Sequence, residues 1–470
     1  MSQTTIAPHD QSPYVTRKLE TDLEGIVEKA YNAQRSWREV QIEQRIAIGH
    51  RFVEEFQKLS DIIPKELTLQ MGRPISQSPG EIRGTVERAN YMLSIAARAL
   101  ADVSLVDTDK PGFRRFIRRD PLGVVFVIAP WNYPYLTMIN SVLPAIISGN
   151  AVILKPSPQT PLTAERLQQA FAAALLPANV LQVVHLSLES VDTIIKHPRV
   201  DFISFTGSVN NGMNVAKASV EGNGFPGVAL ELGGKDPAYV RADANISFTV
   251  AELVDGVYFN SGQSCCAVER IYVHESLYDR FVQEFVEIVK ASLRGLAKYR
   301  LGDPTDAKTN LGPVISLASA AKIREQVSNA IKAGAKALVP EELFPSAKTG
   351  TTYVAPQVLI DVDHTMEVMM EETFGPVVGI MKVKSDEDAI KLMNDSPYGL
   401  TASIWTSSEA DFLSLIDSLE TGTVYQNRCD YLDPALAWTG VKHSGRGVSL
   451  SIYGYDQLTR AKSVNIKTVA

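Results

Sequence analysis

Two adjacent cysteines, Cys265 and Cys266, are the residues of this sequence with the clearest potential for chemistry. They follow a turn-forming Ser-Gly pair in the segment Asn260-Ser-Gly-Gln-Ser-Cys-Cys and precede an apolar run. Adjacent cysteines do not easily bond to each other, and the single remaining cysteine cannot complete a metal site or a disulfide framework. The pair is therefore either structural or contains a nucleophile, and other residues must decide between these interpretations.

Two polar side chains elsewhere in the chain have the chemistry to assist a nucleophile. Glu231 stands between apolar residues in Ala-Leu-Glu-Leu-Gly-Gly, and burial should raise its pKa towards the range of a general base. Asn132 lies in the rigid turn Pro-Trp-Asn-Tyr-Pro, where its amide is able to donate a hydrogen bond to an oxyanion. Each also has a structural interpretation, as a side chain that bonds to turn backbone groups.

Two further segments are candidates for binding a phosphate or a ribose. Thr206-Gly-Ser-Val opens a helix after an apolar strand, and free N–H groups at a helix start suit a phosphate. The spacing is not Gly-x-Gly-x-x-Gly, so an ordinary strand–helix turn explains it better on this evidence alone. Lys155 ends another apolar strand, where ligands gather in α/β sheets. Taken alone, a solvent-exposed lysine explains that position better.

Alternating strands and helices would position these residues. Apolar runs typical of strands buried in a parallel sheet occur at 123–129, 151–154 and 201–205, separated by helical patterns at 136–148 and 162–176. The alternation restarts after residue 234, with strands expected at 236–240, 270–274, 377–383 and 401–405, and helices at 275–297 and 316–333. Other expected elements are helices within 22–60 and at 81–101, a strand at 113–119, and loops at 302–312 and 341–351. This pattern predicts an α/β fold of more than one domain.

The composition excludes several classes of function. The chain has 470 residues, 45% hydrophobic and 21% charged, as expected for a globular protein of two or three domains. A formal net charge of −7 gives no electrostatic basis for binding nucleic acid or an anionic membrane, and no apolar run has the length of a membrane span. Residues 1–13 lack the features of a secretory signal, and three cysteines suit a reducing compartment. We therefore expect a cytoplasmic protein without a metal site.

A series of motifs in fixed order indicates a family. The motifs are Pro121-Leu-Gly-Val, Pro130-Trp-Asn-Tyr-Pro, Gly149-Asn-Ala, Lys155-Pro, Phe205-Thr-Gly-Ser, Leu230-Glu-Leu-Gly-Gly-Lys, Asn260-x-Gly-Gln-x-Cys and Glu371-Glu-x-Phe-Gly-Pro. Together they resemble the aldehyde dehydrogenase superfamily from about residue 20 to the end of the chain. The spacing from Glu231 to Cys265 is also similar to that of the family.

The resemblance implies a mechanism centred on Cys265. The thiolate would attack an aldehyde, and the Asn132 amide and the Cys265 N–H would stabilise the oxyanion of the hemithioacetal. Hydride would pass to a nicotinamide, and Glu231 would activate water to release a carboxylic acid from the thioester. Cys266 would then be a wall residue of the pocket.

The resemblance also implies a domain division and a cofactor site. We expect a Rossmann-like cofactor domain from 1–102 and 122–233, a catalytic α/β domain over 234–444, and a small β oligomerisation element with the C-terminal segment, from 103–121 and 445–470. The protein would be a homodimer or homotetramer. The expected cofactor contacts are Trp131 beside the phosphates, Lys155 at the adenosine ribose, Gly207 and Ser208 at the pyrophosphate, Glu372 at the nicotinamide ribose, Phe374 near the nicotinamide, and Leu232.

Several positions depart from the family pattern. Pro158 stands where the lysine motif usually continues to a glutamate that disfavours a 2′-phosphate. The loss of this carboxylate removes a repulsion and makes NADP admissible, while NAD remains slightly favoured. Ser141 and Arg460 replace a lysine and a glutamate that some relatives use for proton relay. The residues expected to line the substrate tunnel suggest a medium aliphatic or aromatic aldehyde: Tyr133, Leu136, Thr137, Asn140, Ser264, Cys266, Tyr431 and Leu432. No arginine is clearly placed to hold a substrate carboxylate, because Arg428 and Arg460 are expected to anchor loops.

Three other functions compete with aldehyde oxidation to a free acid. A CoA-acylating relative would release the thioester to CoA, but such relatives often lack the glutamate present here as Glu231. A cysteine hydrolase or thioesterase would use the same nucleophile, and none of the seven histidines lies in a motif that supplies its base. An inactive structural relative would be expected to lose the nucleophile or the base, and this chain keeps both.

Overall fold

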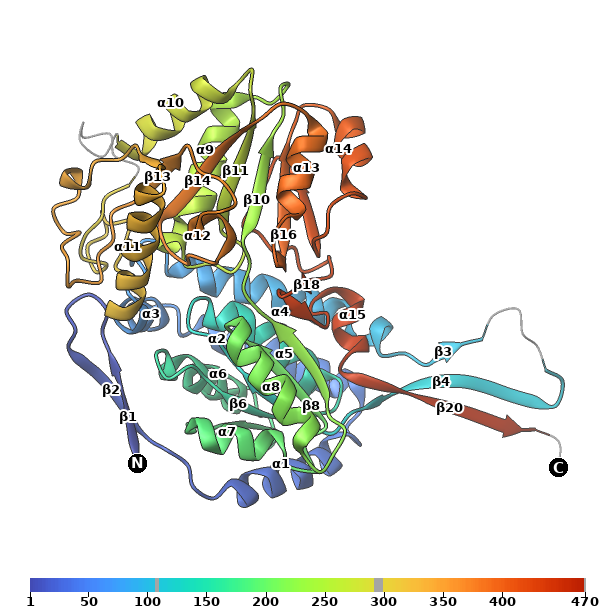
Figure 1. The fold of residues 1–470 in the computed structure, drawn as a ribbon. Helices are drawn as coiled ribbons and strands as arrows, with labels where there is room; N and C mark the ends of the chain where they lie inside the picture. Colours follow the sequence, from blue (N-terminus) through green and yellow to red (C-terminus); the bar gives the residue numbers. More distant parts are fainter. Residues whose placement is uncertain (106–109, 291–298, 469–470) are drawn as a thin grey trace.

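Two α/β bodies and a projecting arm make up the fold, which Figure 1 shows. The computed structural model describes residues 1–105, 110–290 and 299–468. The first body contains a six-stranded sheet of order β19-β9-β8-β5-β6-β7, and the second a seven-stranded sheet of order β12-β13-β14-β11-β10-β16-β17. The predicted α/β fold with parallel sheets is thereby confirmed.

The first sheet is parallel except at one edge. Its parallel strands are β5 (Val124–Ile128), β6 (Ala151–Lys155), β7 (Leu181–Val183), β8 (Phe202–Thr206) and β9 (Gly227–Glu231). The short β19 (Gly445–Arg446), from near the C-terminus, pairs antiparallel with β9 and places Gly445 opposite Glu231. A segment far along the sequence therefore supports the strand that ends at Glu231.

Helices cover both faces of this sheet, which explains why β5 and β6 are apolar at almost every position. One face packs against α2 (Ile42–Gln57), α4 (Pro79–Ala99), α5 (Pro134–Ile147) and α6 (Pro161–Ala173). The other packs against α1 (Leu23–Trp37), α7 (Leu188–Ile195) and α8 (Val209–Glu221). Val125 and Val127 belong to the first core and Val124 and Phe126 to the second, because side chains alternate along a strand. The helices α3 (Ile63–Met71) and α15 (Ser451–Asp456) also contribute side chains to the first core.

The second body repeats this design around another sheet. Its parallel strands are β10 (Asp236–Val240), β11 (Val268–His274), β13 (Gln357–Ile360), β14 (Val377–Val383), β16 (Thr401–Trp405) and β17 (Thr423–Gln426), with β12 (Lys336–Ala337) antiparallel at the edge. One face packs against α9 (Ile246–Tyr258) and α10 (Tyr278–Lys290), the other against α11 (Leu317–Lys332), α12 (Glu367–Met370) and α13 (Asp386–Asn394), with α14 (Glu409–Ile416) beyond. The helix expected over 275–297 is seen as α10, and residues 291–297 lie outside the described part of the chain.

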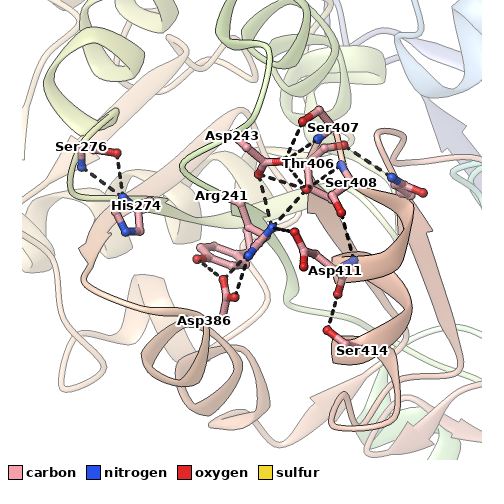
Figure 2. Close-up of polar contacts among 12 residues, drawn as sticks. Arg241, Asp243, His274, Ser276, Asp386, Thr406, Ser407, Ser408, Asp411 and Ser414 are labelled. Atoms are coloured by element: carbon pink, nitrogen blue, oxygen red, sulfur yellow. Dashed lines mark hydrogen bonds and ion pairs between the residues drawn. The ribbon is translucent and has the colours of Figure 1, made fainter.

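A cluster of polar side chains around Arg241 lies at the carboxyl ends of the strands of the second sheet (Figure 2). Arg241 directly follows β10 and forms two hydrogen bonds of 2.9 Å with Asp386, at the start of α13. It also donates to Asp411, in the first turn of α14, at 2.7 Å. The carboxylates lie at helix N-termini, where negative charge is favourable. The carboxyl end of β10 is therefore held by hydrogen bonds within the second body. The amino ends of β10 and β11, at the opposite end of the sheet, face the first body.

The remaining strands form small sheets. β4 (Phe113–Pro121) and β20 (Thr459–Lys467) pair antiparallel in a long arm with β3 (Val103–Ser104), which projects from the two bodies (Figure 1). β15 (Tyr398–Gly399) pairs with β18 (Val441–Lys442), and an N-terminal hairpin joins β1 (Ser2–Ile6) to β2 (Pro13–Lys18). Of the expected arm segments, residues 106–109 and 469–470 fall outside the described residues. The loop expected over 341–351 contains one short 3₁₀ turn, Glu341–Leu343. Within the described residues, no helix combines the length and apolar character needed to cross a bilayer.

Candidate active site

A cavity of about 1160 Å³ is lined by residues of both bodies. It lies where the carboxyl ends of β5, β6, β8 and β9 meet the amino ends of β10 and β11. The catalytic and cofactor-binding residues predicted from the sequence all line it: Trp131, Asn132, Lys155, Gly207, Ser208, Glu231, Leu232, Cys265, Glu372 and Phe374. Every residue expected in the substrate tunnel also lines it. The fold thus brings the predicted site together from segments more than 200 residues apart.

The loop that carries Cys265 has a backbone that few sequences can adopt. After α9, the 3₁₀ turn Phe259–Gly262 has positive φ at Asn260 (52°), Ser261 (58°) and Gly262 (72°). A Cβ on Gly262 would lie 2.2 Å from the carbonyl oxygen of Gly375, so only glycine fits. This turn presents the half-buried Cys265 to the cavity.

The neighbouring Cys266 is held by a carboxylate. Its Sγ donates to Asp430 Oδ1 at 3.1 Å, and Ser264 Oγ donates to the same oxygen at 2.7 Å. The Cys265 thiol beside it, together with burial, raises the pKa of Cys266 well above its ordinary value. A protonated, hydrogen-bonded thiol is a poor nucleophile. The two adjacent cysteines therefore have different environments. All three cysteines are free thiols, and Cys429 lines the same cavity.

Asn132 is fixed by a buried ionic network. Its Nδ2 lies 3.3 Å from the carbonyl oxygen of Gln263, in the loop before Cys265. Arg73 donates to the backbone carbonyl of Asn132 and forms an ion pair with Glu81. Glu81 in turn accepts a hydrogen bond of 2.8 Å from the backbone N–H of Tyr135, at the start of α5. The turn that carries Asn132 is thus held at a set position relative to the thiol loop.

Glu231 ends β9 and accepts two hydrogen bonds. Ser449 Oγ donates to Oε1 at 2.6 Å, and Thr206 Oγ1 contacts Oε2 at 3.5 Å. Burial raises the pKa of Glu231, and the bond from Ser449 opposes that shift. The raised pKa expected from the sequence is present, and a carboxylate of this kind is suited to act as a general base.

Lys155 and the Gly207-Ser208 turn form the other end of the cavity. Lys155 is buried, and burial lowers its pKa to about 8. It has no ion pair among the described residues. Ser208 is the N-cap of α8 and accepts from the backbone N–H of Asn211 at 3.4 Å. A helix start and an unpaired ammonium group together suit the anionic and hydroxyl groups of a dinucleotide.

A second buried ion pair shapes the wall that contains Glu372 and Phe374. Lys235 pairs with Glu269, and the Glu269 carboxylate accepts the backbone N–H groups of Thr373 and Phe374, both at 2.9 Å. Burial raises the pKa of Glu372 to about 7. The rings of Phe374 and Trp131 meet edge to face across the cavity, with centroids 5.5 Å apart.

Sequence reasoning missed three residues of the cavity region, Arg88, Asp430 and Ser449. Arg88 lies on α4 on the same helical face as Glu81 and Met92. Two charged residues, Glu81 and Arg88, on the buried face of a helix were the available signal. The expected anchoring roles are present: Arg460 donates to the carbonyl of Leu122 at 2.6 Å, and the Arg428 guanidinium stacks 3.5 Å above the Tyr431 ring. Ser141 bonds to Ser204 at 2.8 Å instead of supplying a charge.

Comparisons with known proteins agree with this geometry. The model of the aldehyde dehydrogenase family matches residues 2–464. The chain is 34% identical over 452 residues to retinaldehyde dehydrogenase 3 of Rattus norvegicus, which is 95% of this chain and 85% of that protein. Its fold is similar, with TM-score 0.92, to betaine aldehyde dehydrogenase from Staphylococcus aureus in complex with NAD⁺ (28% identity, 100% of this chain and 92% of that one). The TM-score is also 0.92 to NADP-dependent glyceraldehyde-3-phosphate dehydrogenase from Bacillus halodurans with NADP (29% identity, 100% and 96%).

Proposed function

The chain belongs to the aldehyde dehydrogenase family, and from that membership we propose that Cys265, Glu231 and Asn132 carry its reaction. The reaction is the NAD(P)-dependent oxidation of an aldehyde to a carboxylic acid. The observation that supports the assignment is that a free thiol, a carboxylate of raised pKa and an amide fixed beside the thiol loop line one cavity.

In the proposed mechanism, Cys265 is the nucleophile. Its thiolate adds to the aldehyde carbon, and the oxygen of the resulting hemithioacetal is stabilised by the Asn132 amide and the Cys265 N–H. A bound nicotinamide would supply a hydride acceptor, and loss of hydride from the hemithioacetal carbon would leave a thioester on Cys265. Glu231 then removes a proton from water, the water oxygen adds to the thioester, and the carboxylic acid and the free thiol are released.

The cavity residues fit a dinucleotide in both charge and shape. Lys155 supplies an unpaired, buried ammonium group for ribose hydroxyls, and Gly207 and Ser208 supply backbone N–H groups at a helix start for the pyrophosphate. Glu372 would hold the nicotinamide ribose, with Phe374 and Leu232 near the ring and Trp131 near the phosphates. A Cβ on Gly233 would lie 2.7 Å from the Glu372 carboxylate, so the backbone is kept clear on this side.

We propose that the enzyme uses NAD or NADP, with NAD slightly favoured and NADP admissible. Pro158 lines the adenosine end of the cavity and carries no charge to repel a 2′-phosphate. Asp192 also lines this end, but it is paired with Lys196 at 2.8 Å. The Lys155 ammonium group is available to either cofactor.

We also propose the domain roles that the sequence suggested. Residues 1–102 and 122–233 bind the cofactor, 234–444 carry the thiol, and 103–121 with 445–470 form the oligomerisation element and C-terminal segment of a cytoplasmic homodimer or homotetramer. The nine-residue strand β20 pairs with β4 on one side and leaves its other edge without a strand among the described residues, which supports a role of the arm in assembly. Light scattering of the purified protein would determine the subunit number.

The central test is turnover of an aldehyde panel with NAD and with NADP, followed by absorbance of the reduced cofactor. Cys265→Ala is expected to abolish turnover while cofactor binding persists, whereas Cys266→Ala retains turnover because its thiol bonds to Asp430. Full activity of Cys265→Ala would refute the proposal. A rate that depends on added CoA would indicate the acylating alternative, and ester hydrolysis without aldehyde oxidation would indicate a hydrolase.

A further inference from the structure

A buried arginine of the cavity has no carboxylate partner. Arg88, on α4, is only 8% exposed and lines the cavity. Its Nη1 donates to the carbonyl oxygen of Leu136 at 2.8 Å and to Asn140 Oδ1 at 3.3 Å. Both acceptors are neutral. Within the described part of the chain, its Nη2 and Nε donate to no group and the guanidinium forms no ion pair.

Three acidic side chains that line the same cavity have other partners. Glu81 pairs with Arg73, Glu231 accepts from Ser449, and Asp430 accepts from Ser264 and Cys266. A guanidinium group stays charged at neutral pH even where burial lowers its pKa, as it does for Arg88. A buried cation without an anionic partner is unfavourable, and a ligand carboxylate would supply that partner.

The position of Arg88 relates it to the reacting groups. It lies near enough to Cys266, Glu231 and Cys265 for its charge to interact with each of them. Leu136 and Asn140, which hold its Nη1, both line the expected substrate tunnel on α5. A ligand whose aldehyde carbon sits at Cys265 would therefore be able to present a second functional group to the guanidinium within the same cavity.

We propose that the enzyme oxidises short aldehydes that carry a carboxylate at the other end, and that Arg88 binds this carboxylate through Nη2 and Nε. A guanidinium binds a carboxylate through two parallel hydrogen bonds, which fixes orientation as well as adding affinity. The Nδ2 group of Asn140, which donates to no described residue, is a further donor beside it. This inference rests on the proposed function and replaces the medium aliphatic or aromatic aldehyde expected from the sequence.

The experiment compares 4-oxobutanoate with butanal and with the methyl ester of 4-oxobutanoate, which have similar chains and no charge. The wild-type enzyme should show a higher kcat/KM for 4-oxobutanoate than for either neutral aldehyde. Arg88→Gln should lower the ratio of kcat/KM for 4-oxobutanoate over butanal by about 100-fold, mainly through KM. Arg88→Lys, which keeps the charge but loses the two parallel N–H donors of the guanidinium, should give an intermediate ratio. Arg98→Gln is the matched control, because Arg98 is an exposed residue of the same helix, and should leave the ratio unchanged.

Three outcomes would overturn the inference. An unchanged ratio in both Arg88 variants would remove Arg88 from substrate recognition. Equal losses for charged and neutral aldehydes, with a shifted pH profile of kcat, would make Arg88 a positioning residue for Glu231 instead. A wild-type preference for the neutral aldehydes would exclude the substrate class. Each of these outcomes leaves the proposed function intact. The proposed function itself would fail only if the wild-type enzyme oxidised no aldehyde at all.

Discussion

The side-chain amide of Asn132 donates a hydrogen bond to the backbone carbonyl of Gln263 at 3.3 Å, and so joins the first body to the loop that carries Cys265. The bond is near the long end of the normal range for an N–H donor. In the proposed mechanism, this amide donates to the oxygen of the adduct on Cys265. Its donor is pre-positioned by Arg73 and Glu81 and needs little reorganisation to serve an oxyanion.

Replacement of Asn132 by alanine should remove this donor without loss of the cofactor site. We expect kcat to fall about 100- to 1000-fold, the usual effect of deleting one oxyanion donor. Cofactor affinity, measured by isothermal titration calorimetry, should stay close to that of the wild type, because Asn132 is not among the residues proposed to bind the dinucleotide. A kcat within about threefold of the wild type would remove Asn132 from the proposed mechanism.

The raised pKa of Glu231 predicts a distinctive pH dependence. The carboxylate must be ionised to act as a base, so kcat should rise with pH through a value above that of an ordinary glutamate. The bond from Ser449 stabilises the ionised form, so Ser449→Ala should raise the pKa further and move the acid limb of kcat to higher pH. Ser414→Ala is the control, because Ser414 lies on α14 and its hydroxyl donates to the carbonyl of Asp411 (Figure 2). This variant should leave the acid limb of kcat unchanged. An acid limb unchanged by Ser449→Ala would mean that another group limits the rate.

Replacement of Glu231 by glutamine should separate acylation from hydrolysis. We expect a first turnover that still releases reduced cofactor, followed by steady-state turnover about 100- to 10,000-fold slower. Burial raises the folded-state pKa of Glu231 above its unfolded value, so its ionisation destabilises the fold as pH rises through that window. Glu231→Gln should therefore unfold at an equal or higher temperature than the wild type at pH 8. A lower unfolding temperature would attribute the lost activity to misfolding.

Introduction of a carboxylate at position 158 should change the choice of cofactor. Pro158→Glu is expected to lower kcat/KM for NADP by about 10- to 100-fold and to affect NAD much less, because two like charges meet only when the 2′-phosphate is present. Pro158→Ala is the matched control for loss of the proline ring and should change both cofactors alike. Equal losses for NAD and NADP in Pro158→Glu would show that the ribose hydroxyls lie elsewhere.

The strands and helices that surround the cavity were predictable because their local patterns agree with the fold. β5 and β6 are continuous apolar runs, and α5 and α6 have helical spacing, since each packs on a neighbour from the same body. The N-terminal hairpin of β1 and β2 was not predicted. Its residues are mostly exposed, and it is held by distant contacts such as Thr5 Oγ1 to the carbonyl of Pro158 at 2.8 Å. No pattern within residues 1–18 encodes a partner so far along the chain.

In the candidate site, too, residues in local sequence motifs were predictable, and a residue whose role depends on tertiary packing was not. Cys265, Glu231 and Asn132 were found because they lie in short motifs at the ends of strands. Arg88 was not, because its proposed role depends on its having no carboxylate bonded to it among the described residues, which only the packing of α4 against α5 reveals. Sequence motifs identified residues that line one cavity, but they do not show which buried charge lacks a bonded partner.

The Lys235–Glu269 pair should be essential for the wall that contains Glu372 and Phe374. Both side chains are at most 3% exposed, and Glu269 also accepts the N–H groups of Thr373 and Phe374. Lys235→Met would leave Glu269 as an unpaired buried charge, so we expect a loss of about 3–5 kcal/mol in the free energy of unfolding together with weaker cofactor binding. Lys336→Met is the matched control, since Lys336 pairs with Asp361 at 2.8 Å on the surface, and should cost less than about 1 kcal/mol.

The double variant Lys235→Met with Glu269→Gln removes both charges and should be less destabilised than the sum of the single variants, as measured by thermal unfolding midpoints. Additive losses would indicate that the two residues act independently and that the wall is held by the backbone hydrogen bonds alone.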